Sequence, residues 1–221
     1  MSERFVLALD TCFGPVGAAL ATAKGELVGV RGTANQAGRQ AETLPGVVDE
    51  LFRSAGVSFQ QLGRIIVTVG PGAFTGVRVG LAFAKGLKIA TAAEVLGISS
   101  LECLAYQYQE IAGATGVATV LDARRGEVYA FAVDARGMRV VAPCMVPAAD
   151  VSGMLGRSMN SEFAVVGSGR DFVTLDVATK PQPNIVGVDV SRMAVRASSL
   201  SAQNYPATPL YLREPDARLP G

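Results

Sequence analysis

Residues 70–76, GPGAFTG, have the glycine content of a phosphate-binding loop. Small residues let backbone N–H groups approach an anion, and a following helix adds its positive end. A Walker A loop also needs a lysine and a hydroxyl residue directly after its last glycine. Here Val77 and Arg78 follow Gly76, and the first lysine is Lys85. The spacing argues against a Walker A loop and leaves a bare anion at the helix N-terminus open.

The residue types present exclude several kinds of chemistry. The chain of 221 residues contains no histidine, which excludes Ser-His-Asp and Cys-His catalysis and histidine-ligated metal sites. Three widely spaced cysteines, Cys12, Cys103 and Cys144, exclude a disulfide framework and a CxxC metal site. A net charge of +1 argues against a dedicated nucleic-acid binder. We expect no catalytic residue and no bound metal.

The elements that must position the glycine loop follow from the apolar pattern. Three short apolar runs, residues 4–10, 16–22 and 26–32, predict a meander of strands. Residues 40–56 have apolar residues at helical spacing and end in glycine, which predicts an amphipathic helix. Pro45 suggests that this helix begins near Leu44 or is kinked. A buried strand then leads into the glycine loop and the next helix.

The first part of the pattern recurs later in the chain. Leu9 and Asp10 recur as Leu121 and Asp122, at an offset of 112 residues, and residues 117–141 repeat the three-strand pattern. VVGSG at 165–169 resembles TVGPG at an offset of 97 residues, so the second copy is shorter by about one helix. Chance similarity of two β-meanders is the alternative. We expect two related α/β lobes, residues 1–100, completed by the C-terminal segment, and a reduced lobe of residues 101–221.

Two such lobes, each opening with a turn that carries an aspartate, resemble the actin-like and sugar-kinase ATPase fold. That resemblance implies a nucleotide cleft, here vestigial, because Arg124 and Arg125 stand where the second turn of the fold has glycines. The arginines either bind an anion or fill the cleft. We therefore expect weak nucleotide binding at best. The residues that the resemblance assigns to this cleft are Asp10, Thr11, Asp122, Arg124, Gly167 and Gly169.

The helix after the glycine loop carries a stripe of small residues. Gly76, Gly80 and Ala84 lie at four-residue spacing, and helical glycine costs about 1 kcal/mol relative to alanine. A smooth stripe lets another backbone approach closely. Packing on the chain's own sheet and contact with another protein both explain it, and the sequence physics leaves the two open.

Longer motifs resemble the TsaB (YeaZ) family. They are LALDT (7–11), the glycine loop with its helix (70–90), DARRGEVYA (122–130), VGSG (166–169) and PLYLREP (209–215). The similarity that they mark runs from end to end, over about nine-tenths of the chain. One departure is RQAETL (39–44), where Gln40 and Ala41 replace the histidine and serine frequent in the family, which puts in doubt any contact those side chains make.

The resemblance implies an accessory subunit without catalysis of its own. TsaB-like proteins pair with a TsaD-like transferase and a TsaE-like ATPase to make N6-threonylcarbamoyladenosine in tRNAs that read codons starting with A. They also pair with themselves. ATP or ADP, if bound at all, would be weak or shared with the partner, and tRNA would be met only through the complex.

The family pairs through its helices, which implies a partner surface on the two long helices here. The candidate contact residues are Leu44, Val48, Leu51, Val77, Gly80, Leu81 and Ala84. On this view Gly80→Arg abolishes pairing with little effect on folding. No signal peptide or membrane span is expected, which indicates a cytoplasmic protein. The alternative function is an independent actin-like-fold ATPase or small-molecule kinase, and a peptidase finds no support.

Overall fold

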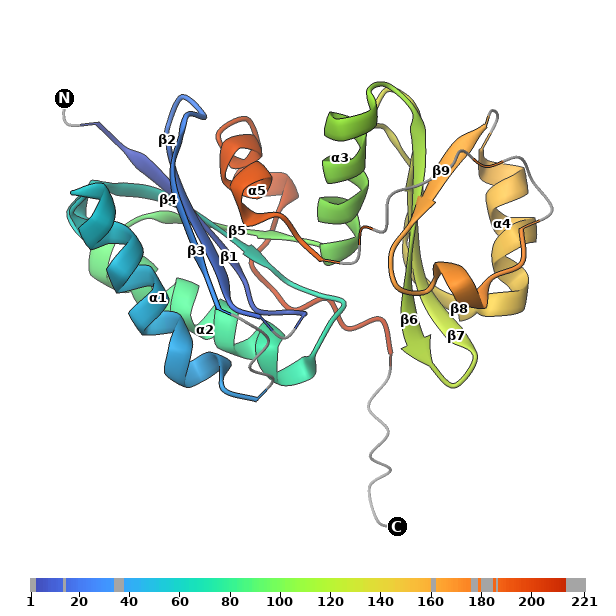
Figure 1. The fold of residues 1–221 in the computed structure, drawn as a ribbon, viewed down its shortest axis with the longest axis horizontal. Coiled ribbons are helices and arrows are strands. Elements are labelled where there is room, and N and C mark those ends of the chain that lie inside the picture. Colours follow the sequence, from blue (N-terminus) through green and yellow to red (C-terminus); the bar gives the residue numbers. More distant parts are fainter. Residues whose placement is uncertain are drawn as a thin grey trace, which may run out of the picture. The chain divides into compact units, whose positions relative to one another are not determined.

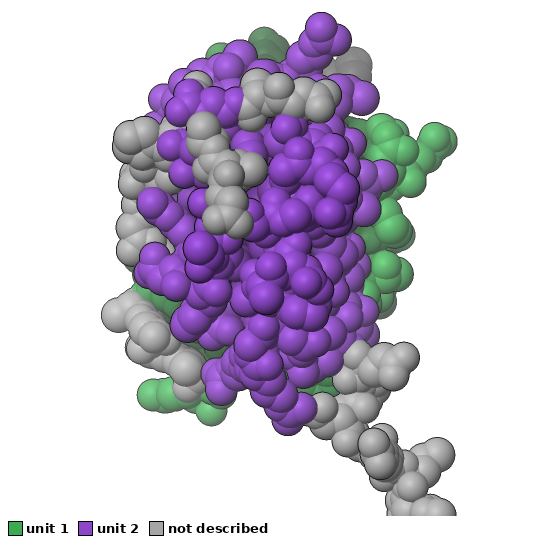
Figure 2. All heavy atoms as spheres, turned by 90° about the vertical axis from the view of Figure 1, so that its right-hand side faces the viewer, with its two compact units in different colours: residues 1–103, 187–209 green, residues 104–186, 210–221 purple. Residues whose placement is uncertain are grey.

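The computed structural model describes residues 3–13, 15–33, 38–159, 162–175, 179, 185 and 187–213. The chain divides into two compact units (Figures 1 and 2). Unit 1 comprises residues 1–103 and 187–209, and unit 2 comprises residues 104–186 and 210–221. The boundary lies inside helix α3 (Ser100–Ala112), three residues after the predicted end of the first lobe. Residues 187–209 belong to unit 1.

Unit 1 is built on a five-stranded mixed sheet in the order β3-β2-β1-β4-β5. β1 pairs antiparallel with β2 and parallel with β4, so a helix must return the chain between β3 and β4. Every residue of β1 is buried, since helices cover both faces of the sheet (Figure 1). The strands are β1 (Phe5–Asp10), β2 (Gly17–Thr22), β3 (Leu27–Gly32), β4 (Leu62–Thr68) and β5 (Glu94–Ile98).

Helices α1 (Gln40–Ala55) and α2 (Phe74–Thr91) pack on one face of this sheet, and α5 (Val190–Ala197) packs on the other (Figure 1). α1 ends at Gly56, whose φ of 65° is left-handed, as the glycine stop predicts. The expected start near Leu44 is wrong. α1 begins at Gln40 and holds Pro45 inside it, because the buried Gln40 side chain accepts the N–H of Gly38 and anchors the first turn.

Unit 2 repeats this arrangement in reduced form. Its sheet has the order β8-β7-β6-β9, which matches β3-β2-β1-β4 of unit 1. The strands are β6 (Gly116–Arg124), β7 (Glu127–Val133), β8 (Arg139–Pro147) and β9 (Phe163–Val166). Helix α4 (Val151–Ser158) packs Val151 and Leu155 against one face. The expected α/β fold of two related lobes, with the second reduced, is confirmed.

Part of the reduction lies where the sequence predicts it, between the third and fourth strands, although half of a helix is lost there and not a whole one. The helix between the third and fourth strands is kept but halved, with eight residues in α4 against sixteen in α1. After β9, the described residues up to 175 contain only the 3-10 helix η3 (Arg170–Phe172). Within the described part of unit 2, therefore, nothing follows β9 as α2 follows β4. The other short 3-10 helices are η1 (Phe59–Gln61), η2 (Ala148–Asp150) and η4 (Ala202–Asn204).

The described helices include none with the length and hydrophobicity needed to cross a bilayer.

Candidate functional site

The glycine loop and α2 lie directly against the turn that follows β1. A Cβ atom added at Gly76 would lie 2.0 Å from the carbonyl oxygen of Thr11, and one added at Gly72 would lie 2.7 Å from Cβ of Cys12. The Thr11 hydroxyl donates to the Gly76 carbonyl at 2.7 Å, and the Ala73 N–H donates to the Cys12 carbonyl at 2.9 Å. Only glycine fits at these two positions, because the first turn occupies the space that a side chain would need.

This packing decides the question that the small-residue stripe raises. A Cβ atom at Gly80 would lie 2.6 Å from the Thr11 hydroxyl oxygen and 3.2 Å from a methyl group of Val67. The stripe therefore faces the chain's own first turn and sheet. The expectation that Gly80→Arg leaves folding intact is wrong, because an arginine there has no room without moving β1 from α2.

The other residues predicted to contact a partner also lie inside the chain. All seven are buried. The six that carry a side chain pack into the core of unit 1. The seven are Leu44, Val48, Leu51, Val77, Gly80, Leu81 and Ala84. A partner would have to meet other residues of these helices, so this set is corrected, while pairing through the helices stays a prediction.

Asp10 lies at the buried end of β1, where it organises the first turn. One of its oxygens, Oδ1, accepts the Thr68 hydroxyl at 2.6 Å and the Cys12 N–H at 3.0 Å. Burial raises the pKa of the Asp10 carboxyl above its ordinary value of 3.8, although the hydrogen bonds from Thr68 and Cys12 lower it in part. With its carboxyl engaged inside the protein, Asp10 ties β1 to the end of β4.

Replacing Asp10 tests this structural role. Asparagine keeps an Oδ1 acceptor for both donors, whereas alanine leaves two buried donors unsatisfied, at a cost of about 2–4 kcal/mol. Because the folded-state pKa of Asp10 is raised, its favourable contribution is present below pH 3.8 and is lost as pH rises through that pKa. We expect Asp10→Asn to equal or exceed wild-type stability at pH 7, with the difference shrinking toward pH 4. Urea denaturation across this range measures it, and a marked loss in Asp10→Asn at pH 7 contradicts it.

Cys12 is the nearest candidate nucleophile, and its surroundings keep it inert. Burial, with the nearby Asp10 carboxyl second, raises the pKa of the Cys12 thiol to about 12. The thiol donates to the Thr68 hydroxyl oxygen at 3.1 Å. A thiol held protonated at neutral pH has little nucleophilic character. The first turn therefore has the features of a packed structural junction.

The second predicted turn, in unit 2, has the opposite character. Asp122 is exposed, and its Oδ1 accepts the N–H of Arg124 at 2.7 Å, while its own N–H donates to the Ser168 hydroxyl at 3.3 Å. Gly167 and Gly169 follow β9 and lie against β6, where added Cβ atoms would fall 2.3 Å from the Val120 carbonyl oxygen and 2.7 Å from the Leu121 backbone. These four predicted residues come together in unit 2, and Asp10 and Thr11 come together in unit 1. A shared nucleotide cleft stays a prediction.

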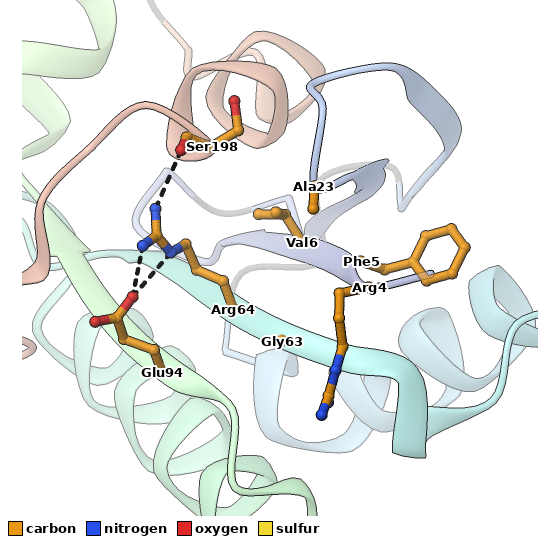
Figure 3. Close-up of a pocket in the computed structure, with 8 residues that line it drawn as sticks. All are labelled: Arg4, Phe5, Val6, Ala23, Gly63, Arg64, Glu94 and Ser198. Carbon is orange, nitrogen blue, oxygen red and sulfur yellow. Dashed lines mark hydrogen bonds and ion pairs between the residues drawn. The ribbon is translucent and has the colours of Figure 1, made fainter. Parts of the chain in front are cut away.

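The described residues of unit 1 form two open pockets. One, of about 250 Å³, adjoins Asp10 and the first turn between β3 and α5. The other, of about 270 Å³, lies at the start of β1 and β4 and includes Arg4 and Arg64 (Figure 3). Arg64 bonds Glu94 at 2.7 Å and the carbonyls of Ala197 and Leu200 at 2.6 and 2.9 Å, so it ties the end of α5 to the sheet.

Sequence reasoning missed Arg64, because the carbonyl groups that it bonds, those of Ala197 and Leu200, lie more than 130 residues away and no local pattern marks them. Among the described residues, no cluster of three or more histidine, cysteine or acidic side chains has the arrangement of a metal site.

Comparison with known proteins identifies the family. The family model described as "TsaD: tRNA N6-adenosine threonylcarbamoyltransferase" matches residues 35–207. The TsaB protein of Haemophilus influenzae is 35% identical over 129 residues, which is 58% of this chain and 53% of that protein. The solved structure of YeaZ from Pseudomonas aeruginosa superposes with a TM-score of 0.73 at 26% identity, covering 95% of this chain and all of that one. The chain belongs to the TsaD-like family, with the TsaB (YeaZ) proteins.

A further relative extends over nearly the whole chain. An uncharacterised protein of Mycobacterium tuberculosis is 32% identical over 216 residues, which is 96% of this chain and 93% of that protein. The curated TsaB proteins carry the description "tRNA threonylcarbamoyladenosine biosynthesis protein". The expected TsaB (YeaZ) membership is confirmed.

Proposed function

We propose that this chain is a non-catalytic subunit that pairs with a TsaD-like transferase, joined by a TsaE-like ATPase, to make N6-threonylcarbamoyladenosine in tRNA. The observation that carries the proposal is the TsaB (YeaZ) membership, since curated TsaB proteins are described by that biosynthesis. The tRNAs concerned are those that read codons starting with A, and the chain meets tRNA only through the complex. The setting is the cytoplasm.

The chemistry of the described residues supports an accessory role. The sequence holds no histidine that could ligate a metal or act as a base. The one thiol at the first turn is buried with a pKa of about 12. Asp10, the carboxylate best placed to meet a nucleotide in unit 1, already accepts hydrogen bonds from Thr68 and Cys12. We propose that no cofactor is required and that any ATP or ADP is bound weakly or shared with the partner.

The surface for the partner is the outer face of α2, beside α1. Spacing of three and four residues brings its small and apolar residues onto one side of the helix, away from the buried stripe. Ile89 leaves 89% of its surface exposed, and the α1 residues Pro45 and Gly46 are exposed as well. The outer face of α2 consists of Val79, Ala82, Phe83, Gly86, Ile89 and Ala90. An apolar helix face of this kind suits a helix of a partner or of a second copy.

Light scattering on a size-exclusion column tests the pairing. The chain is run alone and mixed with the TsaD-like protein of the same organism, with and without ATP. We expect a one-to-one complex that replaces any homodimer. The absence of a complex under both conditions contradicts the proposed function. Turnover of ATP by the isolated chain would favour the ATPase alternative if Asp10→Ala abolishes it. A control substitution at the surface should leave that turnover unchanged.

A further inference from the structure

The turn between β6 and β7 has a backbone that other residues must hold in place. Arg124, Arg125 and Gly126 have φ values of 65°, 57° and 76°, which all lie in the left-handed region. Two of these residues carry side chains, for which that conformation is unfavourable. Exposed turns with this geometry persist when surrounding contacts over-determine them. The contacts that hold this turn therefore decide its shape.

The flanks of the turn are held by an arginine from the far end of the chain. Nη2 of Arg213 donates to the carbonyl of Ala123 at 2.8 Å and to Glu127 Oε2 at 2.6 Å. Ala123 directly precedes the left-handed segment and Glu127 directly follows it. The Arg213 and Glu127 side chains are only 24% and 31% exposed, so water screens this ion pair less than one on the open surface. One guanidinium nitrogen thus joins both ends of the turn.

Unit 1 holds its equivalent turn in a different way. There, the first turn of α2 contacts the residues after β1 through the bonds of Thr11 to Gly76 and of Ala73 to Cys12. The described part of unit 2 has no such helix after β9. The C-terminal segment first lies along β5, where Gly97 N–H donates to the Tyr205 carbonyl at 2.9 Å, and then reaches the turn of unit 2 with Arg213.

We propose that residues 210–213 of the C-terminal segment are a strap that holds the β6–β7 turn, as the first turn of α2 holds the equivalent turn of unit 1, with Arg213 as the positioning residue. The strap keeps β6 and β7 paired up to the turn that contains Arg124 and Arg125. Its release would open this turn while leaving the rest of the sheet paired. The proposal concerns the architecture of this chain and does not depend on its function in tRNA modification.

Trypsin measures this opening directly, because it cleaves after arginine and the turn contains Arg124 and Arg125. Limited proteolysis reports the population of locally open forms when cleavage is slow. Arg213→Ala in the full chain is expected to speed cleavage at this turn about ten-fold, the effect of one charged hydrogen bond. Arg136, exposed in the β7–β8 turn of the same sheet, is the internal control, and its cleavage is expected to stay unchanged. Mass spectrometry of the fragments separates the sites.

Two more variants complete the design. Arg170→Ala removes an exposed arginine of unit 2 outside the strap and is expected to digest as wild type does. Glu127→Gln removes the ion pair without touching Arg213, so it is expected to raise cleavage at the turn even if Arg213→Ala does not fold. Cleavage at the turn in Arg213→Ala and Glu127→Gln at the wild-type rate overturns the proposal. A parallel rise at Arg136 also overturns it, since that result means a general loosening of unit 2.

Discussion

Gly76→Ala, a change of one methyl group, is expected to destabilise unit 1 by about 3 kcal/mol or more. The added Cβ would lie 2.0 Å from the Thr11 carbonyl oxygen and 3.0 Å from its carbon, both backbone atoms. No side-chain rotation relieves that contact, so either α2 or the first turn must move. Movement would break the Thr11 hydroxyl bond to Gly76 and the Ala73 bond to Cys12. Urea denaturation of the isolated chain measures the loss.

Gly86→Ala is the matched control on the same helix. Nothing lies within 4 Å of a Cβ atom at Gly86, and the residue is exposed. Alanine there is expected to stabilise the chain by about 1 kcal/mol, because glycine lowers helix propensity. A loss of unfolding free energy in Gly76→Ala and a gain in Gly86→Ala would show that close packing requires glycine at position 76. Equal effects at both positions would contradict the account of the first turn.

Ile89→Asp and Ala82→Asp are expected to break the complex with the TsaD-like partner while the chain stays folded. Both residues are exposed on the outer face of α2, so neither substitution disturbs the core. Burying an isoleucine is worth about 1.5–3 kcal/mol, and an unpaired aspartate adds a further cost at an apolar interface. The affinity is expected to fall at least about thirty-fold, as measured by isothermal titration calorimetry.

Met138→Asp provides the comparison for these variants. Met138 is 64% exposed but lies in the β7–β8 turn of unit 2. It is expected to leave the affinity unchanged. Wild-type affinity in Ile89→Asp and Ala82→Asp would remove the outer face of α2 from the interface. Loss of binding in Met138→Asp would move the interface toward unit 2.

Local patterns predicted much of the fold. Apolar runs of strand length, punctuated by glycine, located the six meander strands, and the recurrence of Leu9 and Asp10 as Leu121 and Asp122 revealed the two lobes. Strand pairing depends on neighbouring residues in a hairpin, so the sequence carries its own evidence for it. The glycine after α1 was equally informative, because only a left-handed end of the helix explains it well.

The candidate site was harder to predict, because it depends on contacts between distant segments. The small-residue stripe of α2 is compatible with any close neighbour, and only the position of Thr11 shows that the neighbour is internal. Apolar helix positions face either a sheet or a partner with the same spacing, which explains why all seven predicted contact residues proved to be core. Arg64 bonds the carbonyl of Ala197 133 residues away, and Arg213 bonds Glu127 86 residues away, and both separations lie beyond any periodic signal.

The place of α5 has a consequence for how the chain is made. Val190, Met193, Ala194 and Ala197 complete the core above β1, β2, β4 and β5, yet they follow unit 2 in the sequence. During synthesis, residues 1–103 leave the ribosome long before residues 187–209 do. Until then, the face of the sheet around Val6 and Ala8 lacks the side chains of α5. The first lobe therefore cannot complete its core before the second lobe has been synthesised, and its apolar strands stay partly exposed for that time.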